Sequence, residues 1–415
     1  MFKTNVRYDI MKVVKEMERI IFHVDVNNAF LSWTAVLMIK DGSKIDIRNI
    51  PSVIGGDEKK RHGIVLAKSM PAKKKGIVTG ESLYTARKKV DKLYVARADR
   101  QSYIKYSNDF YNILCKYSPV IERYSIDECF LDMTSMRKIY KDPLKTAYMI
   151  RDEIYNKLGF TVNVGIGNSK LCAKMASDFE KPNKVHTLFN DEIKRKMWPL
   201  KVDDLFMVGR SSAKKLHELG IHTIGELANS NIEILIKHFK SMGKMMKEYA
   251  NGIDLSNVER SVPKNQGISN STTLPYDLEK VSDIKKVLYK LSCMVGIRLR
   301  NEKKYAMCIA VQLRNSNFFN YQHQKKLTNP VSSNEDIYNL SCEILNKMWN
   351  GDPVRLVGLR VTDFTDKTFE QISLFEESGK IKQREKMQET LDKINNKYGA
   401  NTINSAALYE KNKDS

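Results

Sequence analysis

Long apolar stretches are missing from this sequence. No segment approaches the ~20 consecutive apolar residues of a membrane-spanning helix, and charged residues interrupt the first twenty positions, so no secretion signal is predicted. The six cysteines lie far apart without a C-x-x-C pair, which argues against a zinc site and against a disulfide framework. We therefore expect a cytoplasmic protein with reduced cysteines and no membrane partner.

Acidic residues are scarce relative to basic ones. Asp and Glu number 49 against 70 Lys and Arg, so the 415-residue chain carries a formal net charge of +21. Such a surplus attracts polyanions, and nucleic acid is the leading candidate partner. The hydrophobic (42%) and charged (29%) fractions exclude a collagen-like or wholly disordered chain. At roughly 100–200 residues per domain, the length predicts two to four domains.

Strands and helices alternate through the first half of the chain. An apolar run over residues 20–26 predicts a buried strand that delivers Asp25 to its carboxyl end, and helical spacing follows it. Further predicted elements are a helix at 102–116, a hairpin at 120–134, a helix at 143–158, a strand at 160–167 and a helix at 169–179. This order indicates an α/β (α+β) core.

The remaining segments differ in composition. Residues 59–75 hold seven Lys or Arg and no acid, which indicates a small subdomain that faces phosphate. Short helices are predicted over 201–252, and a polar segment at 257–266 predicts an interdomain linker. Beyond the linker, two helices and an alternating strand at 305–314 predict a separate α/β domain that ends near Phe364.

Three acids stand out because they lie within predicted strands. Asp25 ends the first strand, and Asp127 with Glu128 lies inside an otherwise apolar hairpin. Buried carboxylates need a compensating cation, and oxygen ligands suit Mg²⁺. Pairing of these acids with nearby Lys or Arg is the alternative, and residue types alone leave both readings open.

Several blocks of the sequence resemble one enzyme family. These blocks are HVDVNNAF, YSIDECFLDMT, VNVGIGNSKLCAKMASDFEKPN and the two-glycine helical segment around residues 209–220. In order and spacing they resemble the Y-family DNA polymerases, specifically the bacterial DNA polymerase IV branch, from about residue 20 to residue 375. The resemblance implies a right-hand polymerase with a palm, small fingers, a helical thumb and a C-terminal α/β little finger.

That resemblance assigns domains along the whole chain. They are an N-terminal extension (1–19), a palm in two parts (20–50 and 99–200), fingers (51–98), a helix-hairpin-helix-like thumb (201–254), a linker (255–267), a little finger (268–366) and a tail (367–415).

The resemblance also implies roles for the acids. Asp25, Asp127 and Glu128 would be the catalytic carboxylates and, with the Val26 carbonyl, would hold two Mg²⁺ ions, for which Mn²⁺ is a substitute. The primer 3′-hydroxyl would attack the α-phosphate of a deoxynucleoside triphosphate, and pyrophosphate would leave.

Other positions correspond to nucleotide contacts. Phe30 would be the steric gate that excludes a ribose 2′-hydroxyl, and Lys181 and Lys73 would bind the triphosphate. Lys73 stands where the family usually has arginine, so it lacks the bidentate fork. Met70 replaces a frequent tyrosine and removes a hydroxyl donor.

Primer-template DNA would contact the thumb and the little finger. Helices meeting at Gly209 resemble a helix-hairpin-helix whose backbone N–H groups hold a DNA phosphate, although Met207 replaces its first glycine. In the little finger, Arg298, Arg300 and Arg314 belong to a basic segment expected to contact DNA.

The tail contains QISLF, which resembles the peptide that docks bacterial polymerases on the sliding clamp. Gln371 would enter a polar pocket and Leu374 with Phe375 an apolar one. Taken together, the resemblance implies a monomeric, nucleoid-associated polymerase of low fidelity that bypasses lesions and does not proofread. Two alternatives stay open: a two-metal nuclease or cyclase, and a non-catalytic, clamp-recruited DNA-binding subunit.

Overall fold

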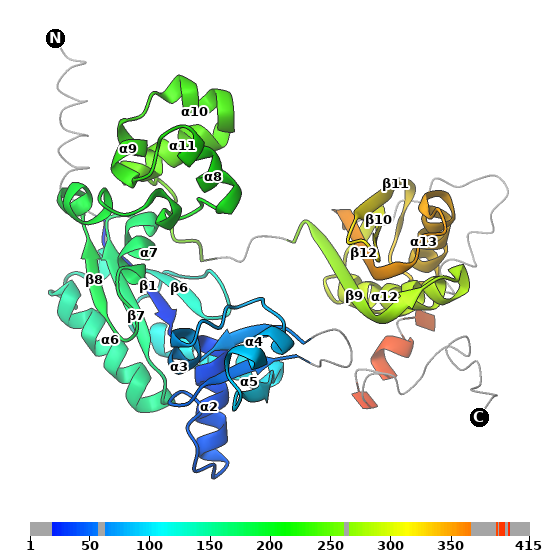
Figure 1. Ribbon diagram of the computed structural model, residues 1–415, viewed down its shortest axis with the longest axis horizontal. Coiled ribbons are helices and arrows are strands. Elements are labelled where there is room, and N and C mark those ends of the chain that lie inside the picture. The colour runs from blue at the N-terminus through cyan, green and yellow to red at the C-terminus, as the bar shows by residue number, and fades with distance from the viewer. Residues whose placement is uncertain are drawn as a thin grey trace. The chain divides into compact units, whose positions relative to one another are not determined.

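A computed structural model of the chain describes residues 19–56, 63–260 and 265–366 and, in the tail, residues 387–388, 390–394 and 397–398 (Figure 1). Two compact units make up this part of the chain: the first holds the described residues up to Arg260 and the second those from Asn265 onward. None of the described helices is long and apolar enough to cross a membrane.

A five-stranded sheet organises the first unit. Its strands, in spatial order, are β5 (Ile121–Arg123), β6 (Glu128–Asp132), β1 (Ile21–Val26), β7 (Val162–Gly167) and β8 (Val185–Leu188). The central strand β1 is antiparallel to both of its neighbours. Side chains alternate between the two faces of a strand, so Phe22 and Val24 pack into the main core while His23 and Asp25 project from the opposite face.

Helices cover both faces of this sheet (Figure 1). Residues of α2 (Ala29–Lys40), α5 (Arg100–Leu114) and α6 (Pro143–Leu158) share the main core with Phe22, and α7 (Lys170–Asp178) packs on the other face. The sequence sets the limits of α6 clearly: the Asp142 side chain accepts a hydrogen bond from Lys145 N, Pro143 begins the helix, and Gly159 ends it with φ 80°.

Gly165 allows α7 to approach β7 closely. A Cβ at this position would lie 1.9 Å from the Ala173 carbonyl oxygen and 2.4 Å from the Ser177 nitrogen. Gly167 is equally restricted, with the Cβ of Cys172 at 2.6 Å. The glycines of VGIGNSK therefore serve strand-to-helix packing, and the segment lacks the spacing of a phosphate-binding loop.

A smaller sheet and a helical cluster complete the first unit. The sheet runs in the order β3 (Val65–Lys68), β2 (Ser52–Gly55) and β4 (Tyr94–Arg97), with α3 (Met70–Lys74) and α4 (Leu83–Lys89) packed against it. The cluster consists of α8 (Arg210–Glu218), α9 (Ile224–Asn229), α10 (Ile232–Phe239) and α11 (Ser241–Ala250). Short 3₁₀ segments lie at Thr134–Met136, Asn190–Glu192 and Val202–Asp204, and a π-helical turn at Ile193–Met197.

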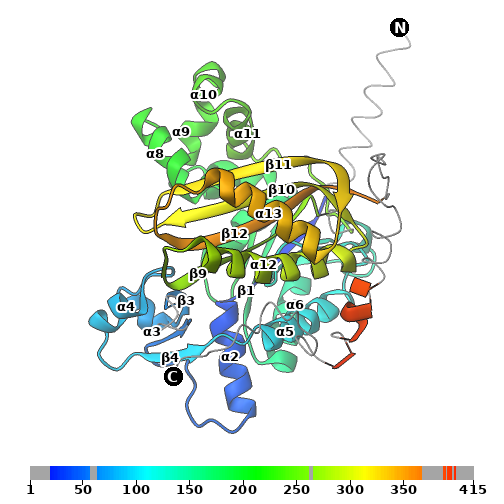
Figure 2. The ribbon, with the colours of Figure 1, turned by 90° about the vertical axis from the view of Figure 1, so that its right-hand side faces the viewer.

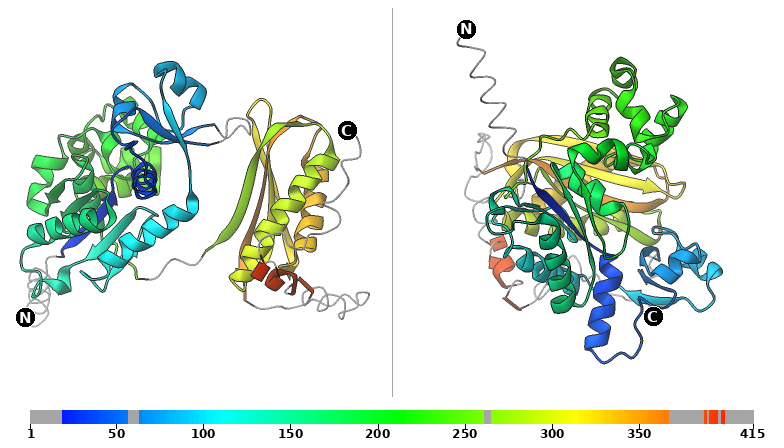
Figure 3. Two further views of the ribbon diagram at one scale, coloured as in Figure 1. Left: turned by 90° about the horizontal axis from the view of Figure 1, so that it is seen from below. Right: turned by 90° about the vertical axis from the view of Figure 1, so that its left-hand side faces the viewer.

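The second unit is an antiparallel sheet with two helices on one face (Figures 2 and 3). The sheet order is β11 (Asn320–Val331), β10 (Tyr305–Asn315), β12 (Val354–Thr365) and β9 (Gly267–Leu278), and the helices are α12 (Val281–Asn301) and α13 (Asn334–Met348). Ile309, Val311 and Leu313 alternate along β10 into the core beneath the helices. The described tail residues are helical.

Candidate active site

Strand pairing brings the three predicted acids to one end of the large sheet. Asp25 on β1 lies opposite Glu128 on β6, and Asp127 directly precedes β6 in the hairpin turn. The Val26 nitrogen donates a hydrogen bond to the Asp127 carbonyl oxygen at 3.0 Å. The backbone positions of the acids are therefore fixed by the register between two neighbouring strands.

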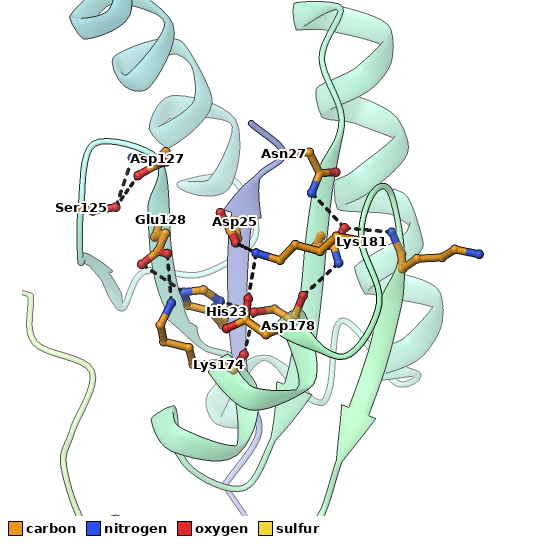
Figure 4. A network of polar contacts seen from close by, with 12 residues as sticks. His23, Asp25, Asn27, Ser125, Asp127, Glu128, Lys174, Asp178 and Lys181 are labelled. Atoms are coloured by element: carbon orange, nitrogen blue, oxygen red, sulfur yellow. Dashed lines mark hydrogen bonds and ion pairs between the residues drawn. The ribbon is translucent and has the colours of Figure 1, made fainter. Parts of the chain in front are cut away.

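The acid side chains bind other residues of the chain (Figure 4). Asp25 forms an ion pair with Lys181, Glu128 lies 2.9 Å from Lys174 Nζ, and Asp127 accepts a hydrogen bond from Ser125 Oγ at 2.6 Å. Among the residues that the structure describes, no three His, Cys, Asp or Glu side chains are grouped to hold a metal ion. Lysine pairing, the alternative left open by the sequence, thus occurs at Asp25 and Glu128.

The pair formed by Asp25 and Lys181 is partly withdrawn from water. Burial raises the pKa of the Asp25 carboxyl, although the Lys181 ammonium opposes this shift. Burial would lower the pKa of Lys181, but Asp25 and then Asp178, at 2.8 Å, raise it above its ordinary value. A cation beside Asp25 thus offsets the cost of burying its carboxylate.

The pKa of Glu128 is shifted in the opposite direction from that of Asp25. Burial would raise its pKa, but contacts with His23 and Lys174 lower the pKa to about 2. Burial lowers the pKa of His23 itself, so its imidazole is neutral near pH 7 and Lys174 supplies the compensating charge. His23 Nδ1 lies 2.8 Å from Ser177 Oγ, and its Nε2 lies 3.7 Å from the Glu128 carboxylate.

The donor set fits a hard divalent cation. Asp25, Asp127 and Glu128 offer carboxylate oxygens, the ligands that Mg²⁺ and Mn²⁺ prefer. Asp25 is only 6% exposed and already has a cationic partner, as a buried carboxylate requires.

A pocket of about 400 Å³ lies beside the acids and is lined by Asn27, Asn28, Ala29, Phe30, Leu66, Ala67, Lys68, Met70, Lys73, Thr79, Asp127, Lys181 and Pro182. It brings together the predicted gate, both predicted triphosphate lysines and one predicted catalytic acid. The Phe30 ring stacks on Tyr103 with centroids 4.8 Å apart and planes 16° apart, and the Tyr103 hydroxyl lies 2.8 Å from Thr34 Oγ1. This packing fixes one face of the Phe30 ring.

The remaining predicted DNA contacts lie elsewhere on the chain. Gly209 caps the N-terminus of α8, and no atom lies within 4 Å of the Cβ position there. Met207, in the place of the family's first glycine, adopts φ 72°, a left-handed conformation that favours glycine. Arg298 donates to Asn270 Oδ1 at 2.7 Å, and Arg314 donates to an asparagine of β11 at 2.8 Å.

Arg300 is engaged within the second unit. Its guanidinium forms a two-point ion pair with Asp392 of the tail and donates to the Ser332 carbonyl oxygen at 2.6 Å. The Arg300 side chain is 12% exposed. Its charge is therefore balanced by the tail. The predicted clamp residues Gln371, Leu374 and Phe375 lie outside the described residues.

Sequence reasoning missed several polar residues of the site. Lys174, His23, Asn27 and Asn163 are all buried and all bond to groups around the acids. Asn163 gave a usable signal, because it is a polar residue within the otherwise apolar strand VNVGIG.

Comparisons with known proteins define the class. Residues 24–178 match the impB/mucB/samB family, residues 265–374 match its C-terminal domain, and residues 190–221 match the IMS family HHH motif. The fold is similar to that of a solved Y-family DNA polymerase chimera, with a TM-score of 0.74 at 23% identity over 84% of this chain and 100% of that chain.

Relatives define the branch. The chain is 51% identical to a DNA polymerase IV of Clostridium acetobutylicum over 95% of this chain and 99% of the relative. It is 35% identical to a DNA polymerase IV of Clostridium kluyveri (96% and 100%) and 34% identical to a DNA polymerase IV 2 of Bacillus subtilis (94% and 94%). The chain belongs to the Y family of DNA polymerases, in the DNA polymerase IV branch. It is thus classed as a DNA-directed DNA polymerase, which favours that reading over a nuclease, a cyclase or a non-catalytic subunit.

Proposed function

We propose that the chain adds deoxynucleotides to a primer 3′ end by two-metal-ion phosphoryl transfer, with Asp25, Asp127 and Glu128 as the catalytic carboxylates. The supporting observation is the pocket in which Phe30, Lys73 and Lys181 lie together with Asp127. A deoxynucleoside triphosphate matches this lining, because it presents an apolar sugar face, four negative charges at most and a reacting phosphate.

Different residues of the site would bind the metal ions, the triphosphate and the sugar. The three carboxylates, with the Val26 carbonyl, would hold two Mg²⁺ ions. Bound there, the ions would lower the pKa of the primer hydroxyl and neutralise the departing pyrophosphate. Lys181 binds the triphosphate once its ammonium exchanges Asp25 for phosphate oxygens, and Lys73 binds it from the fingers side. Phe30, held by Tyr103, rejects a ribose 2′-hydroxyl by steric overlap.

We assign the parts of the hand from the sheets and helices. The five-stranded sheet with α2 and α5 to α7 is the palm, the three-stranded sheet is the fingers, α8 to α11 are the thumb, and the second unit is the little finger. Arg298, Arg314 and the backbone at Gly209 contact primer-template DNA. Residues 371–375 dock on the sliding clamp and raise the concentration of the enzyme at the primer end.

The biological role follows from a small fingers subdomain that checks the nascent base pair weakly. We assign low-fidelity lesion bypass without proofreading to a monomeric, cytoplasmic, nucleoid-associated protein. Primer extension with Mg²⁺ tests the chemistry: Asp127→Ala and Glu128→Ala should abolish synthesis and leave DNA affinity unchanged. Full synthesis by either variant would refute the assignment of that residue.

A further inference from the structure

A pair of buried asparagines connects the acid strand to the segment that carries Lys181. Asn163, the second residue of β7, has no exposed surface, and Asn27, just after β1, is 7% exposed. Asn27 Nδ2 donates a hydrogen bond to Asn163 Oδ1 at 3.0 Å. The two side chains therefore join neighbouring strands of the palm sheet at the end where Asp25 lies.

Asn163 also holds both ends of the segment 177–184. Its Nδ2 donates to the Ser177 carbonyl oxygen at 2.9 Å and to the Glu180 carbonyl oxygen at 2.7 Å. Its Oδ1 accepts from Lys184 N at 3.2 Å as well as from Asn27. A carbonyl oxygen can accept a hydrogen bond from the amide nitrogen of Asn163 but not from its amide oxygen. The two carbonyl partners therefore identify which end of the side chain is Nδ2.

Asn27 supplies the second connection. Its Oδ1 accepts a hydrogen bond from Asn183 N at 2.8 Å. The backbone on both sides of Lys181, at Glu180 and at Asn183, is thus bonded to this asparagine pair. Figure 4 shows Asn27 beside the segment that carries Lys181.

We propose that Asn27 and Asn163 are positioning residues for nucleotide binding. They hold the backbone of Lys181 in the position from which its ammonium group reaches either Asp25 or the triphosphate. The proposal deepens the function proposed above and rests on it. A lysine is a flexible point charge, so the position of its backbone decides how much of its contact energy with phosphate is retained. A buried amide that satisfies several backbone groups at once is well suited to fix that position.

The test uses the full-length chain on a primer-template whose primer lacks a 3′-hydroxyl, so that nucleotide affinity is measured without chemistry. Asn163→Leu keeps a branched side chain of similar shape but removes every hydrogen bond of the amide. We expect the Kd for the correct deoxynucleotide to rise roughly tenfold, as for loss of one charge-assisted contact, with DNA affinity unchanged. Asn163 cannot contact nucleotide itself because it is fully buried.

Lys181→Ala provides the decisive background. If the asparagines act through Lys181, Asn163→Leu should cause no additional loss of nucleotide affinity in this variant. An equal loss in both backgrounds, or no loss in either, overturns the proposal. Unchanged nucleotide affinity in Lys181→Ala alone would instead refute the triphosphate role assigned under the proposed function.

Two further variants complete the design. Asn27→Ala removes the outer connection. Because Asn27 also lines the pocket, this variant is compared in the wild-type and Lys181→Ala backgrounds, and that comparison decides the proposal if Asn163→Leu fails to fold by circular dichroism. Asn168→Leu is the matched control, because Asn168 also bridges two backbone groups, Arg19 O and Asn190 N, each at 3.0 Å. This control should bind nucleotide as the wild type does.

Discussion

Replacing Gly165 with alanine should separate α7 from the five-stranded sheet. The added Cβ would lie 1.9 Å from the Ala173 carbonyl oxygen and 2.4 Å from the Ser177 nitrogen. Optimal carbon contacts are about 3.5 Å, so α7 would have to retreat by roughly 1.6 Å. Both obstacles are backbone atoms of the helix, which no change of rotamer can move aside.

The cost is that of overpacking a rigid core, about 3 kcal/mol or more. For a unit of this size, such a loss lowers the melting temperature by about 6–12 °C. Because α7 carries Lys174, retreat would also remove the lysine from Glu128, so primer extension should fall even below the melting temperature. Differential scanning calorimetry of the full chain measures the transition of the first unit.

Gly209→Ala is the matched control for this experiment. Gly209 has φ −84°, which any residue adopts, and no atom lies within 4 Å of its Cβ position. The melting temperature of the Gly209→Ala variant should therefore equal that of the wild type. If Gly165→Ala also melted with the wild type, the close approach of helix and strand described above would be incorrect.

Three other outcomes are expected. Phe30→Ala should admit ribonucleotides while deoxynucleotide incorporation continues, and unchanged sugar selectivity in single-nucleotide extension would remove the steric role. Lys174→Met should raise the midpoint pH of acid unfolding, measured by circular dichroism. The pKa of Glu128 is about 2, so the stabilisation that its ionised form contributes is present above pH ~4.5 and is lost toward pH 2. An unchanged midpoint would contradict the pairing of Lys174 with Glu128. Deleting residues 371–375 should preserve distributive synthesis but abolish stimulation by the clamp; equal stimulation would exclude this docking peptide.

The large sheet could be predicted because its elements carry local signals. The apolar run at 20–26 and the helix start and stop around 143–158 are confirmed by β1 and α6. Strands β9 and β11 were missed, since their side chains are largely polar and exposed and alternate only weakly. A strand whose outer face meets solvent along its length shows little hydrophobic pattern.

The partners of the acids could not be predicted from spacing. Lys181 lies 156 residues from Asp25, and Lys174 lies 46 residues from Glu128. Only the packing of α7 across the sheet brings these lysines to the acids. The same limit applies to Arg300: residue type marks it as a cation, but not that Asp392 pairs with it.

Lys181 and Lys174, which pair with Asp25 and Glu128, bear on whether folding of the chain depends on metal ions. Each of these two carboxylates has a lysine as its counterion. We therefore expect the chain to fold without Mg²⁺, unlike a zinc finger, which unfolds when its metal is removed. Under the two-metal mechanism proposed above, the same ammonium groups would pair with the acids again once the ions had left. The charges of Asp25 and Glu128 are therefore balanced within the chain itself.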